Sequence, residues 1–193
     1  MERLENIKIG FALTGSFCTL ETAFKIMIEL IREGADVTPI FSDTVSNFDT
    51  RFYSAKEVRD IAIELTKKQP IDSIVSAEPI GPSKMFDVLL VIPCTGNTLV
   101  KINYAITDTP VTMAVKSHVR NNRPVVIGVS TNDGLGNSAK NIGSLLHSKN
   151  LYFVPFGQDN PVQKEKSLVF KEEEVINTIE KALEEKQISP ILV

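Results

Sequence analysis

The seven residues from Phe86 to Ile92, Phe-Asp-Val-Leu-Leu-Val-Ile, form an almost continuous apolar run. A strand with one face in water alternates apolar and polar residues, whereas a parallel strand covered by helices on both faces is apolar nearly throughout. The run leads directly into the polar segment Pro93-Cys94-Thr95-Gly96-Asn97-Thr98. We therefore predict a central parallel strand that ends in a polar loop.

Short β-rich runs alternate with longer helical runs along the rest of the chain. Strands are predicted at residues 7–13, 36–41, 86–92, 124–129 and 151–154. Helices are predicted at 20–32, from a capping box at Ser54–Glu57 to about 68, in stretches leading to 123, up to about 148, and at 172–186. These repeats specify an α/β fold with a three-layer, doubly wound, mostly parallel sheet. No linker or internal repeat divides the chain, so residues 1–193 are expected to form a single domain.

Composition excludes several classes of function. The 21 basic and 24 acidic residues give a net charge of -3, so no positive surface for nucleic acid or an anionic membrane is expected. No apolar run approaches the roughly 20 residues that span a bilayer, and the polar N-terminal residues do not resemble a signal peptide. The two cysteines, Cys18 and Cys94, cannot form a disulfide framework or a zinc site by themselves. A cytoplasmic protein without a metal site is expected.

Ligands of doubly wound sheets bind beyond the carboxyl ends of the strands. Five predicted loops meet at that edge, at residues 14–17, 42–44, 94–98, 130–133 and 156–158. Serine, threonine, asparagine, aspartate and glycine are frequent in them, which suits a phosphate or another polar ligand.

Three of these loops carry candidate binding residues. Gly15 and Ser16 follow the first strand, where the backbone can approach an anion, although a plain tight turn has the same sequence. Ser42 follows the second strand, where its hydroxyl suits a phosphate oxygen or caps a helix. Lys101 lies one turn into the next helix, where it balances a negative charge or faces solvent. The dinucleotide fingerprint G-x-G-x-x-G is absent.

Cysteine and histidine give weaker signals. Cys94 is a candidate nucleophile, but no histidine is placed by the sequence to act as its base. We expect His118 and His147 at the surface or at helix ends, and Cys18 in the core.

The segment from Pro93 to Asp108 resembles a signature of the flavoprotein superfamily that includes the homo-oligomeric flavin-containing cysteine decarboxylases. That signature reads Pro-x-(Ser/Thr)-x-Asn-Thr-hydrophobic-Ala-Lys-hydrophobic-Ala. The resemblance covers nearly the whole chain and implies a Rossmann/flavodoxin-like flavoprotein fold with FMN as its cofactor. By position, it assigns the FMN contacts to Gly15, Ser16, Phe17, Ser42, Thr95, Gly96, Asn97, Thr98 and Lys101.

One branch of this superfamily, the B subunits of dipicolinate synthases, is similar over five segments. These are Ala77–Pro82, Pro93–Thr98, Ala105–Ala114, Ser130–Gly136 and Tyr152–Asp159. The resemblance implies a part in oxidising a dihydroxy-tetrahydro- or dihydro-dipicolinate precursor to the aromatic diacid during sporulation. It also implies a partner, the A subunit of dipicolinate synthase, which binds NAD(P), and a homo-oligomer that is a trimer or larger.

The chain departs from the superfamily in three places. Decarboxylating relatives have a histidine base between the second helix and the third strand, but this chain has no histidine before His118. Their Pro-x-Met-Asn motif is replaced by Ser130-Thr131-Asn132-Asp133, and the arginine of prenyl-transferring relatives by Met113. Cysteine-type decarboxylation and prenyl transfer are therefore not expected.

Two alternatives to the oxidation hypothesis stay open. The chain could be an accessory protein that binds the diacid or the A subunit without flavin, or an FMN-dependent decarboxylase with another base. In the oxidation hypothesis, the candidates for binding the substrate carboxylates are Asn97, Lys101, Lys116 and Asn132.

Overall fold

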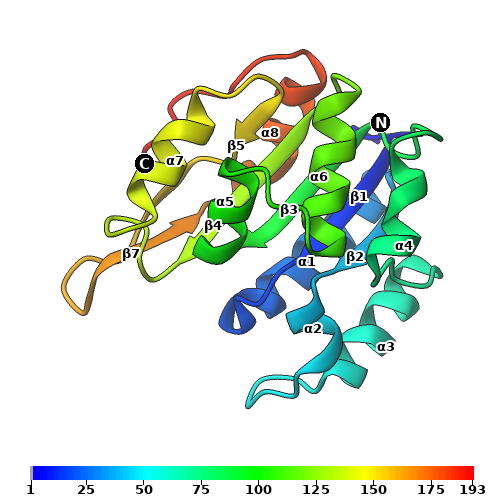
Figure 1. Cartoon of the computed structure of the whole chain (residues 1–193), viewed down its shortest axis with the longest axis horizontal. Helices are drawn as coiled ribbons and strands as arrows, with labels where there is room; N and C mark the ends of the chain where they lie inside the picture. Colours follow the sequence, from blue (N-terminus) through cyan, green and yellow to red (C-terminus); the bar gives the residue numbers. More distant parts are fainter. Residues whose placement is uncertain (1) are drawn as a thin grey trace.

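The computed structural model describes residues 2–193, and a seven-stranded sheet forms its centre (Figure 1). The strands are β1 (Lys8–Leu13), β2 (Asp36–Phe41), β3 (Val88–Cys94), β4 (Val125–Thr131), β5 (Leu151–Phe153), β6 (Phe156–Asn160) and β7 (Lys164–Phe170). The helices are α1 (Leu20–Arg32), α2 (Asp43–Asn47), α3 (Ala55–Thr66), α4 (Ile74–Ala77), α5 (Gly96–Asn103), α6 (Pro110–Arg120), α7 (Ala139–Leu146) and α8 (Val175–Leu183). Three short 3-10 turns complete the chain: η1 (Phe17–Thr19), η2 (Glu78–Ile80) and η3 (Glu172–Glu174).

β3 lies at the centre of the sheet and is buried on both faces, as its apolar sequence predicts. Val88, Leu90 and Ile92 pack into one core with α1, α3 and α8. The intervening residues, Leu89 and Val91, pack into a second core with α5, α6 and α7. Successive side chains of a strand point to opposite faces, so helices cover both sides of the sheet and give the three-layer α/β fold that was predicted.

The sheet is parallel from β2 to β4 and divides at β4. Residues 125–127 of β4 pair in parallel with β5, whereas Ser130 and Thr131 pair with β7 in the antiparallel direction. β6 and β7 form an antiparallel hairpin beyond that point. The strand order of the sheet is therefore β2-β1-β3-β4-β7-β6, with β5 beside β4.

The β6–β7 hairpin is absent from the sequence prediction, and residues 156–158, expected as a loop, begin β6. The outer half of the hairpin, residues 158–166, is exposed or nearly so, and it contains many charged and amide side chains. Its sequence therefore lacks the apolar alternation by which a half-buried strand is recognised. Backbone pairing between β6 and β7 makes these residues a hairpin, and Leu168 and Val169 of β7 join it to β4.

The helix boundaries follow local signals closely. α1 spans the predicted residues, and the chain leaves it through Gly34, whose φ of 85° lies in the left-handed region that glycine adopts without strain. α3 begins with the predicted capping box, in which the Ser54 hydroxyl accepts from the Glu57 amide at 3.2 Å. The Glu57 carboxylate in turn accepts from the Ser54 amide at 2.7 Å. Among residues 2–193, no helix is long and apolar enough to cross a membrane.

His118 was expected at the surface or at a helix end, and its buried position corrects that expectation. It lies in the last turn of α6, but the side chain turns inward and stacks on Phe86 with 6.2 Å between the ring centroids. Nδ1 lies 3.3 Å from the carbonyl of Pro124 and donates to it, while Nε2 is buried and has no hydrogen-bond partner among residues 2–193. His147, in contrast, is exposed at the C-terminal end of α7, as predicted.

Burial of His118 makes the stability of the fold depend on pH. A proton on Nε2 would be a buried charge without a partner, and this desolvation lowers the pKa of His118 to about 4. Between pH 6.5 and 4 the imidazole of the unfolded chain takes up a proton and that of the folded chain does not. The folded state is therefore favoured above pH 6.5 and loses up to about 3 kcal/mol as the pH falls to 4.

The variant His118→Gln should lose less stability over this range, because glutamine donates to the Pro124 carbonyl but does not titrate. Urea unfolding of the protein and the variant at pH 7, 6, 5 and 4 measures the difference, with the titration of carboxylates common to both. Equal losses of unfolding free energy in the two proteins would show that His118 does not carry the effect.

Candidate functional site

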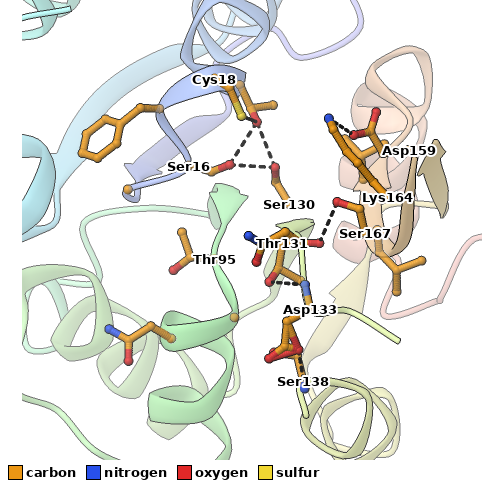
Figure 2. A pocket seen from close by; sticks show the side chains of 18 of the residues that line it. Ser16, Cys18, Thr95, Ser130, Thr131, Asp133, Ser138, Asp159, Lys164 and Ser167 are labelled. Atoms are coloured by element: carbon orange, nitrogen blue, oxygen red, sulfur yellow. Dashed lines mark hydrogen bonds and ion pairs between the residues drawn. The ribbon is translucent and has the colours of Figure 1, made fainter. Parts of the chain in front are cut away.

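The carboxyl ends of β1, β3 and β4 open into a cleft of about 980 Å³ (Figure 2). Loops after these three strands form its floor, and residues of α5, α7 and β7 form its sides. This is the edge at which ligands of doubly wound sheets bind. Three predicted loops meet here: 14–17, 94–98 and 130–133.

Three hydroxyl groups join the loop after β1 to the end of β4. Ser16 Oγ and Ser130 Oγ are 2.9 Å apart, and Thr19 Oγ1 lies 2.9 Å from Ser130 Oγ and 3.0 Å from Ser16 Oγ. Figure 2 shows Ser16 and Ser130 pointing toward each other across the cleft floor. Each hydroxyl can donate one bond within this triangle and keeps a free lone pair for a ligand.

A fourth hydroxyl fixes the loop after β3. Thr14 is buried, and its Oγ1 donates to the Pro93 carbonyl at 2.6 Å and accepts from the Thr95 amide at 3.1 Å. Thr95 then caps α5, because its Oγ1 accepts from the Thr98 amide at 3.2 Å. The amides of Gly96 and Asn97, the first two residues of α5, have no acceptor within the helix and are available to an anionic ligand.

Gly96 is required by close packing. A Cβ atom at this position would lie 2.6 Å from Ser138 Oγ and 2.9 Å from Thr131 Oγ1. The absence of a side chain therefore lets the N-terminus of α5 approach the loop that follows β4.

The structure brings six of the nine predicted flavin residues into the lining of the cleft. They are Gly15, Ser16, Phe17, Thr95, Gly96 and Asn97. Ser42 and Thr98 are buried and do not line the cleft. Ser42 caps α2, since its Oγ accepts from the Val45 amide at 3.4 Å, and Thr98 Oγ1 lies 3.0 Å from Thr95 Oγ1.

Lys101 lies outside the cleft. Its Nζ forms an ion pair with both carboxylate oxygens of Asp108, at 2.8 and 2.9 Å. Val100 of α5 lines the cleft, and Lys101 follows it by about 100° of helical rotation, so that its side chain turns away from the cleft toward Asp108. Lys101 lines a second cavity together with Lys116, whereas Asn97 and Asn132 line the cleft.

Several cleft residues were missed by the sequence analysis. Cys18, expected in the core, is exposed and lines the cleft, because it lies in the turn η1 before the first buried residue of α1. Arg51 and Phe52 reach the cleft from the loop after α2, with the Arg51 guanidinium carbon 4.9 Å from the centre of the Phe52 ring. β7 contributes Ser167, Leu168 and Val169. No local sequence signal marks these residues, since tertiary packing brings them to the cleft.

The charged groups of the cleft are partly paired. Lys164 and Asp159 form an ion pair of 2.5 Å at the hairpin, and the Ser138 amide donates to Asp133 at 3.2 Å. Arg51 and Lys140 also line the cleft and form no ion pair with any residue of 2–193. The cleft therefore offers hydroxyl, amide and cationic groups to an anionic ligand.

Cys94 does not contribute a nucleophile to the cleft. It is fully buried, and this burial raises the pKa of the Cys94 thiol far above its ordinary value. The reactive form of cysteine is the thiolate, which this thiol does not form near neutral pH. No histidine lines the cleft within the described part of the chain.

Comparison with known proteins identifies the family of this chain. Residues 1–188 match the family model described as Flavoprotein. The B subunit of dipicolinate synthase from Bacillus subtilis (strain 168) is 47% identical over 193 residues, which are 100% of this chain and 96% of that protein.

Solved structures of related proteins also resemble this chain. The crystal structure of the dipicolinate synthase B subunit from Bacillus halodurans C has a TM-score of 0.90 and 43% identity, covering 98% of this chain and 97% of that one. A dodecameric FMN-dependent Ubix-like decarboxylase from Escherichia coli O157:H7 shares the fold, with a TM-score of 0.57 and 21% identity over 72% of this chain and 75% of that one. The chain therefore belongs to the flavoprotein family and, within it, to the family of dipicolinate synthase B subunits.

Proposed function

We propose that this chain is the flavin-binding subunit of a dipicolinate synthase and takes part in oxidising a dihydroxy-tetrahydro- or dihydro-dipicolinate precursor to dipicolinate. The observation that carries the proposal is the full-length similarity, at 47% identity, to a protein named as the B subunit of dipicolinate synthase. The polar cleft at the carboxyl ends of β1, β3 and β4 supports it, because a diacid and a flavin phosphate are both anionic.

The residues of the cleft fit FMN. The phosphate of FMN needs N–H and O–H donors: the free amides of Gly96 and Asn97 supply the first, and the Ser16 and Ser130 hydroxyls supply the second by turning from their mutual contact toward the ligand. Its planar ring system needs apolar contacts, which Phe17 offers at the cleft wall. When bound, FMN supplies a two-electron acceptor.

We assign supporting roles to the remaining predicted flavin residues. Ser42 holds the first turn of α2, and Thr44 in that turn lies 3.0 Å from where a Cβ atom of Gly15 would be. Thr98 stabilises the N-terminus of α5 through its contact with Thr95. Lys101 ties α5 to the loop before α6 by its ion pair with Asp108.

The chain contributes binding and orientation to the oxidation. Conversion of a dihydropyridine ring to the aromatic ring removes one hydride and one proton, and FMN held in the cleft, or NAD(P) held by the A subunit, would supply the hydride acceptor. Arg51 and Lys140 are the cleft cations without an acid partner, and we assign them, with Asn97 and Asn132, to the substrate carboxylates. Lys101 and Lys116 take no part in this contact because they line the second cavity.

Two kinds of association belong to the proposal. The designation B in the relative's name implies a partner, and we propose that the A subunit brings NAD(P) to the reaction in the cytoplasm of a sporulating cell. We also propose a homo-oligomer, supported by the fold that this chain shares with a dodecameric relative.

One observation favours the alternative hypothesis, that the chain is an accessory protein without flavin. Within residues 2–193 no histidine lines the cleft, and its two carboxylates are both engaged, Asp159 with Lys164 and Asp133 with the Ser138 amide. Without flavin, the same donors would bind the diacid alone and shape the active site of the A subunit. Retention of flavin separates the two hypotheses.

We expect the purified protein to retain FMN after excess cofactor is removed, with a visible flavin absorption band. Asn97→Leu should weaken FMN binding about tenfold, because it removes an amide side chain at the helix N-terminus and leaves a ligand group unpaired. Asn47→Leu, at an exposed position in α2, is the matched control and should bind FMN as the wild type does. A wild-type protein that retains no flavin would contradict the flavoprotein proposal and favour the accessory role.

Cys18 gives a second readout of where FMN binds. Iodoacetamide should alkylate the exposed Cys18 thiol and leave Cys94 unmodified in the folded protein. Because Cys18 lines the cleft, saturating FMN should slow its alkylation several-fold, as measured by mass spectrometry of the digested protein. Cys18→Ser serves as the control for labelling elsewhere. An unchanged rate in protein that retains FMN would show that the cofactor binds outside this cleft.

A further inference from the structure

A second cavity, of about 450 Å³, lies between α5, α6, α7 and the start of β5. It shares no lining residue with the cleft, and α5 borders both. Asn97 and Val100 of α5 line the cleft, whereas Lys101 and Ile102 line the second cavity. The two cavities are therefore separate sites next to one helix.

The inner wall of the second cavity is aliphatic. Ile102 comes from α5, Val115 and Val119 from α6, Leu145 from α7, and Leu151 from β5. Val115, Leu145 and Leu151 are buried, so the hollow reaches the core of the protein. Its volume lies within the range of small-molecule sites, which are mostly apolar with a few polar groups.

Four basic residues line the same cavity, and among residues 2–193 no aspartate or glutamate lines it. They are Lys101, Lys116, Arg120 and Lys149. Lys101 is neutralised by Asp108, but the other three form no ion pair with any residue from 2 to 193. A chain with a net charge of -3 thus places three unpaired cations beside one apolar hollow.

The helix dipole explains the positions of two of these three cations. Arg120 ends α6 and Lys149 follows α7, and cations are stabilised near the C-terminus of a helix. Lys116 lies in the middle of α6, where no such effect operates. Its position beside Val115 and Val119 is better explained by a ligand that combines an apolar body with a negative charge.

We propose that the second cavity binds a small organic carboxylate with an apolar body. The apolar part enters between Val119 and Leu145, and the carboxylate lies among Lys116, Arg120 and Lys149. Thr107 and Ser148 also line the cavity and offer hydroxyl groups to the acid. This site is independent of FMN and of the function proposed for the cleft.

Two probes with this chemistry test the proposal on the full chain. The first is 8-anilinonaphthalene-1-sulfonate, whose fluorescence rises in an apolar site, and the second is octanoate as a competitor. We expect the wild type to bind about one equivalent of the dye and octanoate to displace it. Lys116→Glu with Arg120→Glu should weaken the binding of both probes at least tenfold. Both positions are exposed, so the fold is expected to remain intact.

The control is Lys84→Glu with Lys166→Glu, which changes the net charge equally at exposed positions outside both cavities. This variant should bind both probes as the wild type does. Equal loss of binding in the two variants, or dye that octanoate does not displace, would overturn the proposal. A wild type that binds no dye would also overturn the proposal. If Lys116→Glu with Arg120→Glu, and not the control, then changed the mass of the assembly in sedimentation, this face would be an interface between copies of the chain.

Discussion

The Thr14 hydroxyl holds the floor of the cleft together. It is buried between the ends of β1 and β3, where it donates to the Pro93 carbonyl and accepts from the Thr95 amide. This single side chain therefore sets the distance between two loops that the sheet would otherwise only bring near each other. Thr95, fixed at its backbone, caps α5 and leaves the amides of Gly96 and Asn97 free at the helix N-terminus. An alanine at position 14 would leave both the carbonyl and the amide without this partner.

The division of the sheet at β4 gives the cleft its other side. β5 accompanies the first half of β4, and β7 replaces it at Ser130 and Thr131. This change brings Ser167, Leu168 and Val169 to the cleft, whereas a regular doubly wound sheet would leave this side to loops. Ser130 is also the hydroxyl that joins Ser16 and Thr19. The end of β4 thus connects the floor of the cleft with the hairpin.

Sequence reasoning succeeds here where the determining forces are local. The apolar run before Pro93 identified the central strand, and the Ser54–Glu57 pair identified the start of α3, because burial on two faces and helix capping leave clear patterns. The polar hairpin left no such pattern, because its outer strand residues are exposed and are held by backbone pairing, which does not depend on apolar side chains. Lys101 illustrates a further limit. The motif places it one turn into α5, but only the rotation of the helix decides that it faces Asp108 rather than the cleft.

In the proposed function, flavin bound in the cleft takes part in the aromatising oxidation, and an anaerobic single turnover tests this role most directly. The FMN-loaded protein, the A subunit and the precursor are mixed in the absence of free flavin and NAD(P). We predict that the flavin absorption band bleaches as dipicolinate forms, with about one equivalent of product for each flavin. Product that forms only after NAD(P) is added, with the flavin band unchanged throughout, would contradict this role and assign the redox step to the partner alone.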